Sequence, residues 1–251
     1  MLINSLLAAL AAVALVVIAV FAFKKYGKHD DEPSGPTAGH AGAMLSSLFL
    51  LVFAIAVIVP WATADTARHD TYTEAQSLNE AYWAAGPLSV ADRRMVRDGL
   101  TDYVRFVVGT EWSRMADGKL SDAGWQKLDA LRFALRDMQA NDDNTKAARD
   151  DVRERIREVY AARRQRSIDA GASLPTGLLI FTAFTGLIMI IFPFMAGARP
   201  RGMAMVPLVV MAVLLCVCIY TVFNINHTFA GALAVGPDAF TSVLQGFARI
   251  P

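Results

Sequence analysis

The chain has 251 residues, of which 55% are hydrophobic and 19% are charged, and its formal net charge is +1. A soluble domain of this size normally carries more charge, so the composition favours an integral membrane protein. The near-neutral balance argues against a nucleic-acid-binding protein, because such a protein presents a basic stripe that displaces counterions from phosphate groups. Most of the charged residues fall between Asp65 and Asp169, which predicts one hydrophilic domain between apolar segments.

Two apolar segments precede this domain. Residues 1–23 hold an almost unbroken run of Leu, Ala, Val, Ile and Phe, and about 20 such residues cross roughly 30 Å of hydrocarbon. We interpret the run as a retained anchor rather than a signal peptide, because no basic residue precedes it and lysines follow it directly. A second span is expected over 44–62, with Trp61 at an interfacial end. Residues 24–43, rich in Pro, Gly and Ser, are expected to form a short loop without fixed structure.

A second pair of apolar segments follows the domain. Spans are expected over 174–195 and 203–223, and the short connection over 196–202 requires a tight antiparallel hairpin. Residues 224–251 are expected to form a C-terminal tail. The sequence therefore predicts an all-α, four-span protein of two helix pairs, with a soluble helical domain over 63–173 inserted between the second and third spans.

Basic residues in the short loops predict the orientation. They lie in the first and last loops: Lys24, Lys25, Lys28, Arg199 and Arg201. Both loops are therefore expected in the cytoplasm, which places the termini and the soluble domain outside it, at the plasma membrane. Three arginines directly before the third span oppose this orientation: Arg163, Arg164 and Arg166. Long loops obey the rule poorly, so the short loops decide the expectation.

Apolar residues recur at three- and four-residue steps through the soluble domain. Such stripes predict an antiparallel helical bundle, with the charges between them on solvated faces. The expected inward residues include Tyr72, Leu78, Val96, Leu100, Tyr103, Val104, Val107, Leu128, Leu131, Leu135, Val152, Ile156 and Val159. Ser89 and Asp92 predict a capping box, Asp117 and Gly118 a turn, and Thr145 the start of the last helix.

Several short pieces, in this order and spacing, resemble the bestrophin-like family of bacterial membrane proteins. They are Gly39-His40, Glu74-Ala75-Gln76-Ser77-Leu78, Glu111-Trp112 with Met115 and Gly118, Ala162-Arg163-Arg164, Leu174-Pro175, and Phe229-Ala230-Gly231 followed by Val235, Pro237 and Phe240. The resemblance extends from about Gly39 to Leu244. It implies a fold more than an activity, since the family is largely uncharacterised. Its likeness to bestrophins, which are pentameric anion channels, implies a homo-oligomeric ion channel.

The sequence departs from the family pattern after the fourth span. Asn224, Asn226 and His227 stand where the resemblance implies an acidic residue and an arginine. A charge pair that served ion binding or packing there would be weakened in this chain.

Seven residues are candidates for a pore or its vestibule. Asp65, His69 and Glu74 follow the second span within four turns and would concentrate ions before a pore, although they also fit the solvated start of a helix. Phe181 and Phe184 would form an apolar ring in an oligomer, although Phe-rich spans more often face lipid or a neighbouring helix. Two further candidates at the end of the fourth span complete the set: Asn224 and Asn226.

No motif of an enzyme, a cofactor site or a metal site is found, and we expect no cofactor. The spans contain no Asp, Glu, Lys or Arg at mid-membrane, which argues against a coupled transporter. Two hypotheses remain. The first is a homo-oligomeric channel, which needs a ring of subunits because four spans cannot enclose a pore. The second is a membrane-anchored sensor or scaffold whose helical domain binds an envelope partner.

Overall fold

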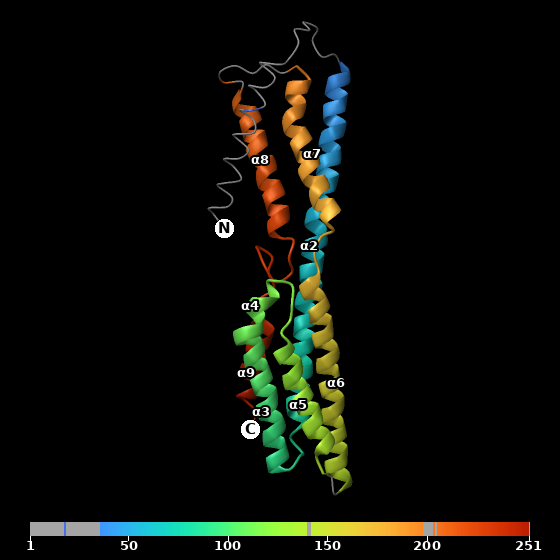
Figure 1. Ribbon diagram of the computed structural model, residues 1–251, viewed down its shortest axis with the longest axis vertical. Helices are drawn as coiled ribbons and strands as arrows, with labels where there is room; N and C mark the ends of the chain where they lie inside the picture. Colours follow the sequence, from blue (N-terminus) through green and yellow to red (C-terminus); the bar gives the residue numbers. More distant parts are fainter. Residues whose placement is uncertain (1–17, 19–35, 140–141, 198–202, 204, 251) are drawn as a thin grey trace. The chain divides into compact units, whose positions relative to one another are not determined.

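The computed structural model describes residue 18 and residues 36–139, 142–197, 203 and 205–250 (Figure 1). It is 82% helix without strands in that part of the chain, which confirms the all-α expectation. The chain divides into two compact units. Unit 1 comprises Met1–Pro60 and Leu174–Asn226, and unit 2 comprises Trp61–Ser173 and His227–Pro251.

Unit 1 contains the apolar helices. Three helices of the described chain are long and apolar enough to cross a membrane: α2 (Pro36–Ala84), α7 (Thr176–Met195) and α8 (Met205–Asn224). The span expected over 1–23 lies outside the described residues. The loop expected over 24–43 is wrong in its second part, because α2 already begins at Pro36. A proline suits the first helical turn, where its missing N–H has no partner to lose.

Small residues bring the helices of unit 1 together. A Cβ atom at Gly186 would lie 2.6 Å from Ile219 Cδ1 and 3.3 Å from Phe49 Cε2, so the glycine permits close approach of α7 to α8 and α2. The main-chain N–H of Leu174 donates to the side-chain oxygen of Asn226 at 2.7 Å, which ties the residue before α7 to the residues after α8.

Within the part of the chain that the structure describes, most of the span surface is left uncovered. In the most apolar 18-residue window, only 17% of residues are buried in α2, 33% in α7 and 17% in α8. Large apolar side chains such as Leu50 and Leu214 are exposed. This surface has to be covered by lipid or by other protein helices.

Unit 2 is a helical bundle formed by the end of α2, α3 (Val90–Phe106), α5 (Asp122–Asp137) and α6 (Asp143–Gly171). A π-helical turn, η1 (Val107–Glu111), and the short α4 (Trp112–Met115) continue α3. The expected apolar stripes form its core, except that Tyr72 is exposed. The predicted helical bundle is therefore confirmed.

Polar side chains cap the helices of unit 2. Ser89 Oγ accepts from the N–H of Asp92 at 3.2 Å, as expected, but the Asp92 carboxylate accepts a hydrogen bond from the Ser89 hydroxyl instead of from the cap amide. Asp142 accepts from the N–H of Thr145 at 2.9 Å. Its cap makes α6 begin at Asp143, two residues earlier than predicted. Gly118, in the predicted turn, has a φ of 76°.

The segment over 224–251, expected to form a C-terminal tail, contains a helix that packs on unit 2. Helix α9 (Asp238–Phe247) packs its apolar face into the core of unit 2. The Trp112 ring meets Phe229 and Phe240 edge-on, each at 5.6 Å between centroids, and Tyr82 stacks on Phe247 at 4.1 Å. The C-terminal segment is therefore part of the hydrophilic unit.

Candidate functional site

Unit 2 encloses five polar residues that we call the buried charge cluster: Glu74, Tyr103, Glu111, Arg163 and Arg166. All five are fully buried. They come from α2, α3, η1 and, for both arginines, α6. Arg163 and Arg166 are three residues apart on one helix, so they share a face. The cluster therefore joins the main elements of the bundle through charge rather than through apolar contact alone.

Arg163 forms a bidentate ion pair with Glu111 through its two Nη atoms. Arg163 Nη1 lies 2.7 Å from Glu111 Oε1, and Nη2 lies 2.6 Å from Oε2. The Ser121 N–H donates to the same carboxylate at 3.0 Å, and the Ser121 carbonyl accepts from Arg163 Nη2 at 3.0 Å. This bidentate geometry is the strongest form of an arginine–carboxylate pair. It fixes the loop before α5 to η1 and α6.

Arg166 makes the second bidentate pair. Its Nε lies 2.7 Å from Glu74 Oε2 and its Nη2 lies 3.1 Å from Glu74 Oε1. Its Nη1 also donates to Glu111 Oε1 at 3.1 Å, so Arg166 bridges the two carboxylates. The Tyr103 hydroxyl donates to Glu74 and accepts from Arg163 Nη1 at 3.1 Å. Two carboxylates thus balance two guanidinium groups, with a phenol between them.

Aromatic rings and a glycine enclose the two arginines. The Arg163 guanidinium lies 4.7 Å from the ring centroid of Trp125, and that of Arg166 lies 5.0 Å from Phe240. Gly124 is in contact with the first pair, since a Cβ atom there would lie 2.2 Å from Arg163 Nη2. Cation–π contacts and tight packing therefore replace the water that a charged group would otherwise need.

The protonation states of the cluster follow from its geometry. Burial acts to raise the pKa of Glu111, but the hydrogen bonds from Arg163 and the charges of both arginines outweigh it and lower that pKa. Burial, together with the Glu74 carboxylate, raises the pKa of Tyr103. Burial acts to lower the pKa of Arg166, but Glu74 outweighs it and raises that pKa. These shifts favour the charged forms of Glu111 and Arg166 and the neutral form of Tyr103.

Asp169, one further turn along α6, is a buried acidic neighbour of the cluster. It is only 7% exposed, and its Oδ1 accepts from Gln165 at 3.0 Å. Among the described residues no hydrogen bond reaches its buried Oδ2. Burial, with a smaller contribution from the nearby Asp70 carboxylate, raises the pKa of Asp169 to about 6. The folded state therefore binds the Asp169 proton more tightly than the unfolded state does.

Replacing Asp169 with asparagine is expected to stabilise the protein at neutral pH. A carboxyl group whose pKa is higher in the folded than in the unfolded state stabilises the fold fully only below its pKa in the unfolded state, which is about 4 for Asp. This stabilisation is lost as the pH rises through the pKa of the folded state. For Asp169 that loss runs from about pH 4 to pH 6 and above. At pH 7 the variant should unfold at a higher denaturant concentration than the wild type, and this difference should vanish towards pH 4.

Denaturant unfolding of the detergent-solubilised chain between pH 4 and pH 8 measures this difference. Asp102→Asn is the matched control, since Asp102 is exposed on α3. Equal pH profiles for Asp169→Asn and the wild type would contradict the interpretation.

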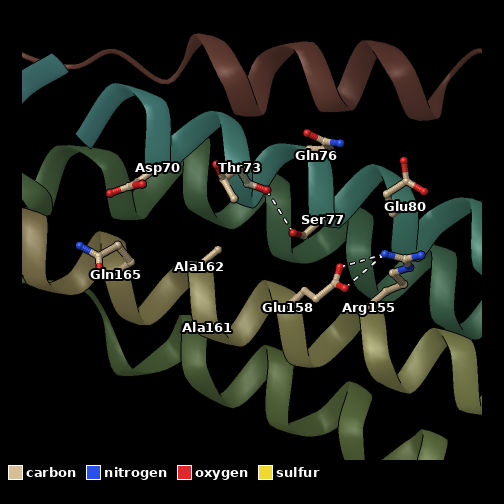
Figure 2. A pocket seen from close by; sticks show the side chains of 10 residues that line it. All are labelled: Asp70, Thr73, Gln76, Ser77, Glu80, Arg155, Glu158, Ala161, Ala162 and Gln165. Carbon is tan, nitrogen blue, oxygen red and sulfur yellow. Dashed lines mark hydrogen bonds and ion pairs between the residues drawn. The ribbon is translucent and has the colours of Figure 1, made fainter. Parts of the chain in front are cut away.

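On the surface of unit 2, α2 and α6 flank a polar groove of about 540 Å³ (Figure 2). We call it the acidic groove. It is lined by Asp70, Thr73, Gln76, Ser77 and Glu80 of α2 and by Arg155, Glu158, Ala161, Ala162 and Gln165 of α6. Arg155 Nη1 pairs with both oxygens of Glu158 at 3.2 Å. The two alanines leave the space open, because their side chains end at Cβ. Among the described residues no group of His, Cys, Asp and Glu could hold a metal ion.

The candidate pore and vestibule residues do not all lie in the same unit of the chain. Asp65 and His69 are exposed on the part of α2 that belongs to unit 2. The expectation for Glu74 is wrong, because it is fully buried against Arg166 and cannot contact water in a vestibule. Phe181 and Phe184 are exposed on α7 in unit 1, 43% and 54% respectively.

The two asparagines at the end of α8 make local contacts. The side-chain oxygen of Asn226 accepts from the Leu174 N–H at 2.7 Å. Asn224 Nδ2 lies 3.5 Å from the Tyr220 hydroxyl. Asn226 therefore has a structural partner of its own in the position where the family pattern implied a charge pair.

Sequence reasoning missed the buried charge cluster, although a signal was present. The apolar stripe of α6 runs through Val152, Ile156 and Val159, and its next positions are Arg163 and Arg166. A charged residue at a stripe position has to be buried with a partner. Glu111 likewise follows Val107 by four residues on one stripe, and Glu74 precedes Leu78 by four. The charges were instead expected on solvated faces.

These observations define an all-helical membrane protein whose hydrophilic unit is a helical bundle locked by buried ion pairs. The chain belongs to the bestrophin-like family, since the model of the bestrophin-like domain matches residues 6–240. Comparison with curated proteins and with solved structures gave no match. Three pieces of the sequence that carry the family resemblance contain Glu74, Glu111 and Arg163, so the cluster lies within the matched domain.

Proposed function

We propose that the protein is a homo-oligomeric ion channel for anions. The observation that carries the proposal is the uncovered apolar surface of α2, α7 and α8 in a chain of the bestrophin-like family. A few spans cannot enclose an aqueous path, so a pore needs several subunits around a common axis. The candidate constriction is the exposed pair Phe181 and Phe184 of α7. Apolar rings of this kind gate ion flow by dewetting.

Chloride efflux from liposomes containing the purified chain tests the proposal. The wild type should release chloride faster than empty liposomes, and Phe184→Ala should raise the rate further because it widens the ring. Phe223→Ala is the matched control, since Phe223 is similarly exposed on α8, at 48% against 54% for Phe184. Chloride release that is no faster than from empty liposomes would contradict the channel proposal.

The proposed topology has four spans, with the first over 1–23, both short loops in the cytoplasm and unit 2 outside it. The basic residues of the two short loops support this orientation. The side of the membrane on which unit 2 lies can be tested with a cysteine in place of Asn144, in a chain whose Cys216 and Cys218 are changed to serine. An impermeant thiol reagent should label it in intact cells, and labelling only after the cells are opened would reverse the orientation.

The alternative function is a sensor or scaffold whose hydrophilic unit binds an envelope partner. The acidic groove supports it, because a hollow of about 540 Å³ on the hydrophilic unit offers space and polar side chains to a bound partner. This alternative does not require a ring. A monomeric chain that conducts no chloride would favour it over the channel.

A further inference from the structure

We propose that the hydrophilic units of neighbouring copies dock head to tail, the acidic groove of one copy against a basic hollow of the next. This inference rests on the oligomeric channel proposed above and assigns the surfaces that hold its ring together. Both surfaces lie within unit 2, and each uses α6 as one wall.

The basic hollow is a depression of about 370 Å³ between α5 and α6. Four of its lining residues are arginines, against one carboxylate, Asp129: the arginines are Arg132, Arg136, Arg153 and Arg157. On each helix the two arginines are four residues apart, so they lie one above the other on a single face. The hollow is therefore lined by two pairs of arginines, one pair on each helix.

The surroundings hold these guanidinium groups in place without covering them. Arg132 stacks over the Tyr160 ring at 4.6 Å, and Arg136 lies 5.2 Å from the Phe133 centroid. The carboxylate of Asp129 accepts a hydrogen bond from the Tyr160 hydroxyl. Three of the arginines also form surface pairs with acids that do not line the hollow: Arg136 with Asp137, Arg153 with Asp150, and Arg157 with Glu154. Exposed pairs of this kind contribute little and exchange partners readily.

The acidic groove has the complementary charge. Three carboxylates line it, from Asp70, Glu80 and Glu158, against the single guanidinium of Arg155. That guanidinium already pairs with Glu158 and Asp151 on its own helix. Figure 2 shows Asp70 and Glu80 on α2 at the two ends of the groove. Carboxylates in the lining of one surface and guanidinium groups in the lining of the other favour contact with a second copy and disfavour contact of either surface with itself.

The positions of the two surfaces on α6 suit a ring. Glu158 of the groove and Arg153 of the hollow are five residues apart, so they point about 140° from each other and lie only about 8 Å apart along the helix axis. Two different surfaces on nearly opposite sides give a heterologous contact, which closes into a ring or extends as a filament. Copies inserted in one bilayer share one orientation, which favours rotation about the membrane normal and hence a ring.

Charge reversal tests the assignment, with mass in lipid nanodiscs as the readout. Glu80→Lys with Glu158→Lys reverses the groove, and Arg136→Glu with Arg157→Glu reverses the hollow. Each double variant should raise the dissociation constant of the ring by at least about tenfold, because like charges then oppose each other. The fourfold variant restores complementarity and should recover the wild-type mass. Asp98→Lys with Asp102→Lys is the matched control, on the exposed face of α3, which lines neither surface.

The possible outcomes distinguish a failure of the groove-to-hollow contact from a failure of the channel proposal. A wild-type ring whose mass is unchanged by either double variant would overturn the groove-to-hollow contact and leave the oligomer standing. Dissociation in both double variants without recovery in the fourfold variant would also overturn the pairing. A monomeric wild type would remove both proposals. Circular dichroism and cooperative thermal melting confirm folding for each variant, and a folded fourfold variant with the wild-type mass is the decisive supporting result.

Discussion

Replacing Arg166 with methionine is expected to lower the free energy of unfolding by about 3–5 kcal/mol, the usual cost of removing one partner of a buried ion pair. The change leaves the Glu74 carboxylate without the two hydrogen bonds that Arg166 donates at 2.7 Å and 3.1 Å. Tyr103 remains as a donor to Glu74, but a neutral phenol does not balance a buried charge. Denaturation of the full chain in mild detergent, followed by tryptophan fluorescence, measures the loss.

Two further variants show whether the loss comes from the unpaired charge. Arg105→Met removes an arginine that is exposed on α3 and lines neither surface of the proposed subunit contact, and it should cost no more than about 0.5 kcal/mol. Adding Glu74→Gln to Arg166→Met removes the orphaned charge and should recover part of the stability. Similar losses for Arg166→Met and Arg105→Met would show that the cluster does not stabilise the bundle.

Replacing Gly124 with alanine is expected to destabilise the bundle by about 2–3 kcal/mol, in the range found for overpacked cores. Gly124 lies inside α5, where alanine would ordinarily gain up to about 1 kcal/mol in helix propensity. The added Cβ would instead lie 2.2 Å from Arg163 Nη2 and 2.8 Å from Glu111 Oε2. The clash would push apart the bidentate pair of Arg163 and Glu111, so packing outweighs propensity.

Gly171→Ala is the control for this prediction. Gly171 ends α6, and a Cβ built there would meet no atom within 4 Å beyond its chain neighbours and the backbone of its own helix. The control should change the free energy of unfolding by no more than about 0.5 kcal/mol. If Gly124→Ala were as stable as Gly171→Ala, the close packing of α5 against the charge cluster would be contradicted.

The helices of this protein could largely be predicted from its sequence, because stripes and caps are local signals. Val96, Leu100 and Val104 are buried as their spacing predicts, and Ser89 caps α3. The family could also be identified from short pieces in order. Helix α9 has an equally regular apolar stripe in Ala239, Phe240, Val243 and Phe247, so this helix could also have been predicted from the sequence.

The partners of the buried charges could not be predicted in the same way. Glu74 and Arg166 are 92 residues apart, and Glu111 and Arg163 are 52 apart. Periodicity places each side chain on the inner face of its helix, but only the packing of α2, η1 and α6 determines which charges meet. The acidic groove has the same origin, because it depends on the distance between two helices and on the small side chains that face it.

The cluster also bears on how the proposed channel would work. Five buried polar groups joined by bidentate pairs are expected to stiffen the core of unit 2, since partial loss of such a network leaves unpaired charges. A rigid hydrophilic unit can hold its neighbours in a fixed ring through exposed charged surfaces. Gating by movement within unit 2 is correspondingly disfavoured, and the apolar helices are the better place to look for a gate.

The mass of the purified chain in lipid nanodiscs tests the central claim most directly. The account predicts one closed species whose protein mass is a whole multiple of 27.2 kDa, larger than a dimer and stable on dilution. A monomer or a dimer would contradict it, because neither encloses a pore, and would leave the sensor or scaffold as the function of this protein.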